Sequence, residues 1–283
     1  MIILSTKEIQ KSYGMDLIIK DASFTLQEKD KVGVIGVNGA GKSTLFKIIA
    51  GIEDRDSGEL YLGKNMSIGY MSQFLDFQWD TTLWQEMLKV FSGIIGIENK
   101  LKGLEHEISS MKSGADEARM ESLMKAYSSL QQEYENNDGF AYESKIRGIL
   151  KGLGFSPQDY DNRVALFSGG QKPRVALGKV LLEKRDILLL DEPTNYLDIE
   201  AVEWLESFLK DYKGALMIIS HDRYLLDNVT NRTFEIENGR LLEYEGNYSY
   251  YIVKKDENRE QAQKEYENQQ KEIARQEAII ARY

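Results

Sequence analysis

The most specific chemical pattern in the sequence is G-x-x-x-x-G-K-[ST], formed by Gly36-Val37-Asn38-Gly39-Ala40-Gly41-Lys42-Ser43. It follows an apolar stretch that predicts a strand and precedes residues 42–50, whose apolar spacing predicts a helix. In this context the glycines let backbone N–H groups surround the β- and γ-phosphates of a nucleotide. Lys42 adds a positive charge, and the Ser43 hydroxyl can reach Mg²⁺. Residues 36–44, which include Thr44, are therefore expected to bind all the phosphates of one nucleotide.

Two adjacent acids follow the apolar residues 187–190, which predict a buried parallel strand. In an open α/β sheet, ligands bind at the carboxyl ends of the strands. Asp191 is therefore expected to hold Mg²⁺, directly or through water. Glu192 is expected to accept a proton from an attacking water, a contribution of roughly 10² to 10⁴ in rate. The alternative is that the two acids lie at the end of a strand, contact solvent and bind no ligand.

Three further side chains could serve the same nucleotide. Gln73 follows the strand-like residues 68–72 and could ligate Mg²⁺ or orient water, although most glutamines are surface residues. His221 follows an apolar run, and its neutral ring could bond a γ-phosphate or the attacking water; otherwise it is a polar strand-end residue. Tyr13 could stack on a nucleobase, although core packing is the usual role of tyrosine.

A second candidate anion site lies at Phe167-Ser168-Gly169-Gly170-Gln171, which opens onto residues of helical spacing. Since residues 36–44 already meet the phosphates of one nucleotide, Ser168, Gly169 and Gly170 are expected to face a different nucleotide. That nucleotide would be held by a partner copy or domain. The alternative is a glycine turn before an ordinary helix.

The rest of the chain supplies the elements that must position these residues. Short apolar runs separated by turn residues predict strands in residues 1–80, and a strand returns at residues 215–220. Residues 82–163 change to helical spacing, with a polar break at 112–116 that predicts a helical hairpin. Beyond residue 246 the chain is expected to be a charged helix that ends without a capping signal, which indicates that more protein follows.

The totals narrow the class of protein. The 283 residues carry a formal net charge of -10, which argues against a general nucleic-acid coat, and no DNA partner is expected. The absence of cysteine excludes a disulfide scaffold and suits a reducing cytoplasm. No apolar run approaches the roughly 20 residues needed to cross a bilayer, so no membrane insertion is expected.

This set of motifs, in this order, resembles the ATP-binding cassette (ABC) superfamily. The phosphate loop resembles Walker A, residues 187–192 Walker B, Gln73 the Q-loop glutamine, FSGGQ the signature, and His221 the switch histidine. Asn195-Tyr196-Leu197-Asp198 resembles the D-loop. The resemblance implies a P-loop NTPase cassette: an α/β fold with a RecA-like core, N-terminal antiparallel strands and an inserted helical subdomain. It also implies ATP and Mg²⁺ as cofactors and a head-to-tail sandwich of two cassettes. Each ATP would then lie between one Walker A and the partner's Ser168, Gly169, Gly170 and Gln171, with Asp198 nearby.

Residues 220–227 and 244–251, with the charged helix that follows, resemble the ABC-F branch. Its members carry two cassettes in one chain without a membrane domain and act on ribosomes, in translation control or antibiotic resistance. By this resemblance, residues 1–245 are the first cassette, with a helical subdomain at about 82–163, and residues 246–283 begin the linker. The hairpin at 98–135 resembles the branch's arm, but its five basic and eight acidic residues do not support RNA binding.

Three positions depart from the family pattern. Phe167 replaces the usual signature leucine, and Pro173 lies in the first turn of the signature helix, where proline is tolerated. Tyr196 stands where the branch commonly has histidine. We therefore expect a cytoplasmic ABC-F type ATPase that needs two cassettes. The alternatives are the ATPase subunit of a membrane transporter and a regulatory module that binds ATP without turnover. Glu192 and His221 argue against the last.

Overall fold

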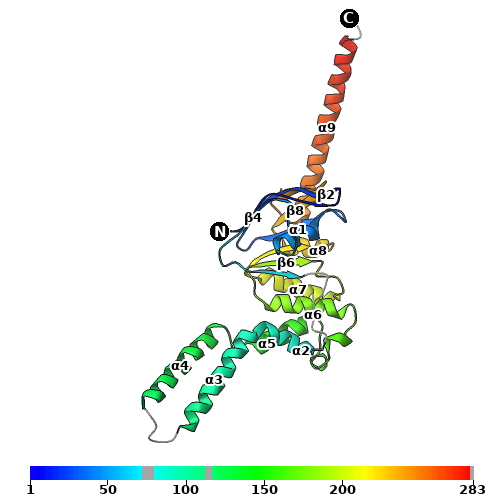
Figure 1. Cartoon of the computed structure of the whole chain (residues 1–283). Helices are drawn as coiled ribbons and strands as arrows, with labels where there is room; N and C mark the ends of the chain where they lie inside the picture. Colours follow the sequence, from blue (N-terminus) through cyan, green and yellow to red (C-terminus); the bar gives the residue numbers. More distant parts are fainter. Residues whose placement is uncertain (72–79, 112–116, 281–283) are drawn as a thin grey trace. The chain divides into compact units, whose positions relative to one another are not determined.

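The structure, a computed structural model, describes residues 1–71, 80–111 and 117–280. Within these residues, nine strands form one sheet in the order β4-β1-β2-β9-β8-β3-β7-β6-β5 (Figure 1). The strands are β1 (Ile2–Tyr13), β2 (Asp16–Gln27), β3 (Lys31–Ile35), β4 (Ser57–Leu62), β5 (Ile68–Met71), β6 (Ile187–Asp191), β7 (Ala215–Ile219), β8 (Arg232–Glu237) and β9 (Arg240–Tyr244). The predicted α/β cassette fold, with antiparallel strands at the N-terminus, is confirmed.

The centre of the sheet is parallel. β3 pairs with both β7 and β8, and β6 pairs with β7. Every residue of β6 and of β7 is buried, as expected for continuous apolar strands covered on both faces. The register pairs Val34 and Asp191 with Ile219 from either side. The carboxyl ends of β3, β6 and β7 therefore meet at one edge of the sheet.

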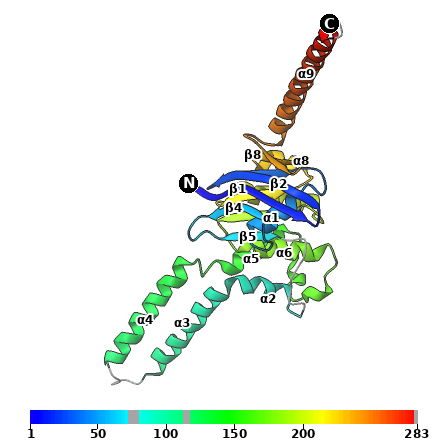
Figure 2. The same cartoon turned by 45° about the horizontal axis from the view of Figure 1, so that its top comes forward.

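The N-terminal strands are antiparallel and lie side by side in Figure 2. β1 pairs with β2 along most of its length and with β4 on its other side. Their apolar residues, among them Ile3, Leu26 and Ile9, join the buried core formed with Val32, Val34 and Phe46. The hairpin places Tyr13 at the end of β1.

The chain divides into two compact units. One holds residues 1–70, 185–194 and 206–283, and the other holds residues 71–184 and 195–205. The second unit is helical, as the predicted insertion requires. It contains α2 (Leu83–Leu88), α3 (Ser92–Ser110), α4 (Glu117–Asn136), α5 (Tyr142–Gly152) and α6 (Gln171–Leu182). α7 (Ile199–Asp211) contributes residues to both units.

Helices α3 and α4 pack against each other along the part of the hairpin that the structure describes. Arg119 of α4 pairs with Glu107 of α3 at 2.7 Å, and the Tyr127 hydroxyl donates to Glu105 at 2.9 Å. These contacts are polar and exposed. Leu101 of α3 and Tyr134 of α4 are the buried residues of these two helices.

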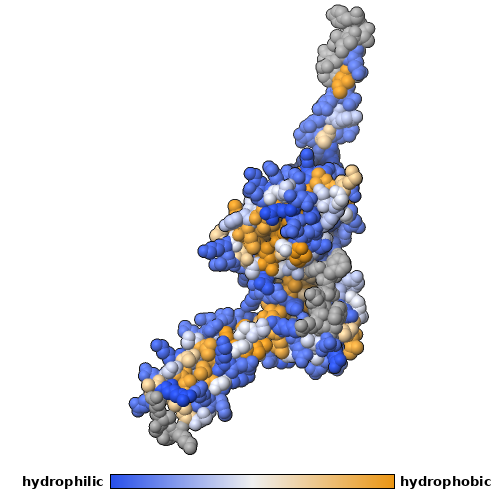
Figure 3. Space-filling view, viewed as in Figure 1, coloured by the Kyte–Doolittle hydropathy of each residue, from blue (hydrophilic) through white to orange (hydrophobic). Residues whose placement is uncertain are grey.

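In the first unit, α1 (Lys42–Ile49) follows β3, and α8 (Arg223–Val229) precedes β8. The last helix, α9 (Tyr248–Ile280), begins in contact with α8, β8 and β9. Beyond its first turns its surface is mostly hydrophilic (Figure 3). Among the described residues, no helix has the length and apolar character that a membrane span would need.

Candidate functional site: a nucleotide site at the strand ends

The phosphate loop joins β3 to α1, and two of its positions have no room for a side chain larger than that of glycine. Gly36 has φ 153°, and a Cβ there would lie 2.6 Å from the carbonyl oxygen of Ile236. Gly41 caps α1 with φ 99°, and its Cβ would lie 2.9 Å from Ile18. An L side chain at either position would force backbone or neighbouring strands apart. The loop therefore keeps backbone N–H groups within reach of a ligand.

The Lys42 side chain folds back onto this loop. Its Nζ donates to the carbonyl oxygens of Gly36 at 2.9 Å and Val37 at 3.2 Å. Burial lowers the pKa of Lys42, while the carboxylates of Glu192 and Asp191 act in the opposite direction. A phosphate would supply the negative charge that favours the ammonium form.

The residues predicted to hold Mg²⁺ lie together where the structure describes them. Asp191, the last residue of β6, is 3 % exposed. Burial raises its pKa, and a hydrogen bond with the Ser43 hydroxyl lowers it. A buried carboxylate beside a hydroxyl offers the hard oxygen ligands that Mg²⁺ prefers. The pair fits the predicted metal. Gln73, predicted as a third ligand, lies outside the described residues.

Glu192 turns away from the strand by a left-handed backbone conformation, with φ 51°. Its N–H still donates to the Ile219 carbonyl at 2.8 Å, which anchors the turn to β7. Its side chain is 11% exposed, and burial raises its pKa. A non-glycine residue held in this conformation is found at functional sites more often than elsewhere. The Glu192 carboxylate meets His221, whose Nε2 lies 3.5 Å from its Oε1.

Tyr13 is not a core residue. Its side chain is 48% exposed, and its hydroxyl donates to Glu53. The hydroxyl also lies within hydrogen-bond reach of Thr44 at the start of α1. The ring is thus held beside the phosphate loop with much of its surface free. The stacking interpretation is compatible with this geometry, and the core alternative is not.

The signature residues belong to the helical unit. The Ser168 N–H donates to Gln171 Oε1 at 3.0 Å, and the Gln171 N–H donates to Ser168 Oγ at 3.3 Å, so two reciprocal bonds close the turn that leads into α6. Gly169 has no atom within 4 Å of a hypothetical Cβ, whereas that of Gly170 would lie 3.5 Å from Tyr196. Phe167, in place of leucine, is 6% exposed and packs on Phe155 at 5.6 Å.

The D-loop is fastened within the same unit. Arg174 of α6 donates to the Tyr196 carbonyl at 2.7 Å and pairs with Asp198 at 3.3 Å. The other Asp198 oxygen accepts from the Ala201 N–H at 2.9 Å and so caps α7. Tyr196 itself is 63% exposed with φ 71°. Asp198 thus caps α7 in this chain, and its predicted contact with a nucleotide stays a prediction.

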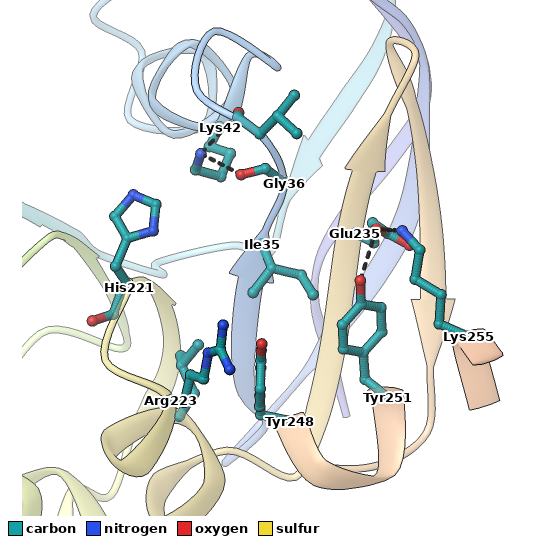
Figure 4. Close-up of a pocket in the computed structure, with 12 residues that line it drawn as sticks. Ile35, Gly36, Lys42, His221, Arg223, Glu235, Tyr248, Tyr251 and Lys255 are labelled. Atoms are coloured by element: carbon teal, nitrogen blue, oxygen red, sulfur yellow. Dashed lines mark hydrogen bonds and ion pairs between the residues drawn. The ribbon is translucent and has the colours of Figure 1, made fainter. Parts of the chain in front are cut away.

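One feature near the site had no predicted role. A cavity of about 320 Å³ adjoins Lys42 and His221 and is also lined by Arg223, Glu235 and Tyr248 (Figure 4). Arg223 and Tyr248 fall within residues 220–227 and 244–251, the two segments that resemble the ABC-F branch. That signal marked the segments without indicating that they meet.

The geometry defines an ATP-binding cassette, and comparison with known proteins agrees. A family model described as ABC transporter matches residues 19–195, and a second ABC transporter model matches residues 234–283. The chain belongs to the ABC transporter family, as one of its nucleotide-binding ATPase domains, and members of this class hydrolyse ATP.

The relatives identify the branch. The putative ATP-binding protein YdiF of Bacillus subtilis is 42% identical over 100% of this chain and 43% of its own length. ABC transporter F family member 5 of Arabidopsis thaliana is 38% identical over 98% of this chain and 40% of its own length. The energy-dependent translational throttle protein EttA of Mycobacterium tuberculosis is 36% identical over 90% of this chain and 44% of its own length. These matches confirm the predicted ABC-F branch. The chain thus spans less than half the length of these relatives.

Solved structures support the fold independently. The ATP-binding subunit of an ABC transporter superposes with a TM-score of 0.63 at 19% identity, over 86% of this chain and 90% of that one. At this identity the match establishes the cassette fold alone.

Proposed function

We propose that this chain is one cassette of a soluble, cytoplasmic ABC-F type ATPase that hydrolyses Mg-ATP between two cassettes arranged head to tail. The observation that carries the proposal is the division of the motifs between the two units. Lys42, Asp191 and Glu192 lie together in the first unit, while Ser168 precedes a helix of the other. The relatives, more than twice as long as this chain, have room for a second cassette.

Each residue has a role in this proposal. The loop N–H groups and Lys42 bind the phosphates, and Tyr13 stacks on the adenine. Ser43, Asp191 and Gln73 hold Mg²⁺, which polarises the phosphates when it is bound. Glu192 takes the proton of the attacking water, and His221 bonds the γ-phosphate. Ser168, Gly169 and Gly170 complete the partner's site.

The ribosome is the proposed partner of the complete protein. The support is the name of a relative: EttA is described as an energy-dependent translational throttle. Residues 234–283, which a family model matches, contain most of β8, all of β9 and α9, a charged helix suited to join two cassettes. The formal charge of -10 provides no electrostatic attraction to RNA, so a specific surface must supply the contact.

Sedimentation of the full-length protein tests the proposal. With ATP present, Glu192→Gln should bind ATP, stay closed and co-sediment with ribosomes. Lys42→Ala, which should fail to bind ATP, is the matched control and should remain in the supernatant. Sedimentation of Glu192→Gln with membranes alone would support the transporter alternative and end the ribosome proposal.

A further inference from the structure

The cavity beside Lys42 and His221 lies within the first unit, among the end of β3, the strand β8 and the starts of α8 and α9. Positive side chains predominate in its lining: Lys42, Arg223 and Lys255 are cations, and Glu235 is the acid among the described lining residues. Figure 4 shows Arg223 and Tyr248 below Ile35, with Lys42 above. A cationic cavity is notable in a chain whose net charge is -10.

Glu235 does not neutralise all the positive charge of the cavity, because its carboxylate is already paired with neighbouring side chains. It is 4% exposed and accepts from the Tyr251 hydroxyl at 2.8 Å, and Lys255 pairs with it directly. The Tyr244 hydroxyl donates to its other oxygen at 3.4 Å. Lys255 and Glu235 therefore cancel each other, and they fasten α9 to β8.

Two polar groups of the lining make no hydrogen bond or ion pair within the part of the chain that the structure describes. Arg223 is exposed and has no carboxylate at ion-pair distance there, and its guanidinium carbon lies 5.9 Å from the centre of the Tyr248 ring, within cation–π range. The Tyr248 hydroxyl has no hydrogen-bond partner among the same residues. In Figure 4 the guanidinium and this hydroxyl both point toward the Lys42 side of the cavity. A planar guanidinium beside a hydroxyl donor suits an oxyanion.

We propose that this cavity binds the inorganic phosphate released from ATP, with Arg223 and Tyr248 as its ligands. The inference rests on the proposed ATP hydrolysis. In that reaction the water oxygen bonds to the γ-phosphorus, and the bond from that phosphorus to the bridging oxygen breaks. The bridging oxygen stays on ADP, and the water proton passes to Glu192. Phosphate is thus freed beside Lys42 and His221, which line the same cavity.

The position of Tyr248 gives this site a consequence for the linker. Tyr248 is the first residue of α9, and the next residue, Ser249, is bonded to Asp227 of α8 through its N–H at 2.8 Å and its hydroxyl at 2.9 Å. A phosphate held by Arg223 and Tyr248 bridges the starts of α8 and α9. The product phosphate then lies where α8, which follows His221, meets the start of α9.

Equilibrium binding of radiolabelled inorganic phosphate to the full-length protein loaded with ADP tests the proposal. Arg223→Gln should raise the phosphate Kd roughly ten-fold or more, the range expected for losing a hydrogen bond to a charged group. Tyr248→Phe should raise it by a smaller factor, and Arg223→Lys should recover part of the loss. ATP affinity should be unchanged in all three. Arg240→Gln, which changes an exposed arginine of β9 outside the cavity, is the matched control.

Unchanged phosphate affinity in Arg223→Gln would overturn the proposal. So would an equal loss of ATP and phosphate affinity, since Arg223 would then belong to the nucleotide site. Phosphate binding to the ADP-loaded protein needs neither ATP hydrolysis nor ribosomes. A failure of the proposed function would therefore leave this binding result unchanged, and the two proposals can fail separately. In a single turnover, free phosphate should lag behind total phosphate, and Arg223→Gln should shorten the lag. An unchanged lag counts against the site.

Discussion

Glu192 and His221 face each other at the ends of neighbouring strands: the His221 N–H donates to Glu192 Oε2 at 3.3 Å, and its Nε2 lies 3.5 Å from Oε1. The contact joins the turn after β6 to the turn after β7. The His221 ring, 69% exposed, therefore sits beside a carboxylate that is nearly buried. A water placed between them would meet one proton acceptor and one orienting group.

Glu192→Gln should keep ATP binding and lose turnover, by roughly 10² to 10⁴ in rate for a general base. The amide retains the shape of the side chain but cannot take a proton. Lys42→Ala should instead weaken ATP binding, because Lys42 contacts phosphates in the ground state. Calorimetric titration and steady-state hydrolysis by the full-length protein measure the two effects. Equal loss of nucleotide affinity in both variants would refute this division of roles.

Tyr13→Ala should weaken the binding of ATP and of GTP by similar factors, worth about 1 to 3 kcal/mol for a stacked base. A stacking face accepts either purine. Tyr13→Phe is the control, because it keeps the ring and removes the hydroxyl that bonds Glu53. If Tyr13→Ala binds ATP like the wild type, the base lies elsewhere.

The 283-residue chain should bind ATP but hydrolyse it slowly, because Ser168 has no nucleotide of its own to complete. Missing donors in the transition state cost roughly 10² or more in rate. Where copies of the chain pair with each other, turnover should rise with the square of protein concentration at high dilution. Ser168→Arg should abolish that turnover at unchanged ATP affinity. Brisk hydrolysis that is independent of concentration would show that the signature acts within one chain.

Glu86→Gln should destabilise the chain by about 2 kcal/mol at neutral pH, the range for hydrogen bonds to a charged group. Glu86 is 1% exposed and pairs with Lys179 at 2.6 Å and with Lys89 at 2.5 Å. Burial by itself raises the pKa of Glu86, but these hydrogen bonds outweigh it and hold the pKa below the ordinary 4.5. A depressed carboxyl pKa stabilises the fold above about pH 4.5, and this stabilisation is lost as pH falls through the folded-state pKa.

Urea unfolding at pH 7 and below pH 4 measures this difference, which should shrink in acid. Glu143→Gln is the matched control, because Glu143 pairs with Arg147 four residues further along an exposed helix face. Such surface pairs contribute about 0.5 kcal/mol or less. An equal loss in both variants, or a loss that persists unchanged in acid, would show that the buried pair is not responsible.

Much of the nucleotide site follows from local sequence. The glycines of the phosphate loop, Lys42 and Ser43 are adjacent in the chain, so one strand–loop–helix segment positions them all. The strand-end acids were equally predictable, because a continuous apolar run followed by two acids has few placements in a parallel sheet. The same local logic predicted that a helix begins directly after Ser168, Gly169 and Gly170.

The pairing of distant segments depended on tertiary structure. Ser43 and Asp191 meet because β3 and β6 both pair with β7, a register that no local pattern specifies. Likewise, only the fold shows that Tyr13 is exposed beside Thr44 rather than packed in the core. Arg223 and Tyr248 are 25 residues apart in the sequence, and their meeting follows from the return of β8 and β9 between them.

The sequence by itself therefore determined the chemical groups, since these depend on residue types at short spacing. It also indicated the family and the branch, because its motifs resemble theirs. The tertiary structure decided which groups share a space, how deeply each is buried and which are left without partners. The physical reason is that burial and pairing are properties of side chains packed from many segments at once. The cavity beside Lys42, built from five separate stretches of chain, has no counterpart in any single stretch.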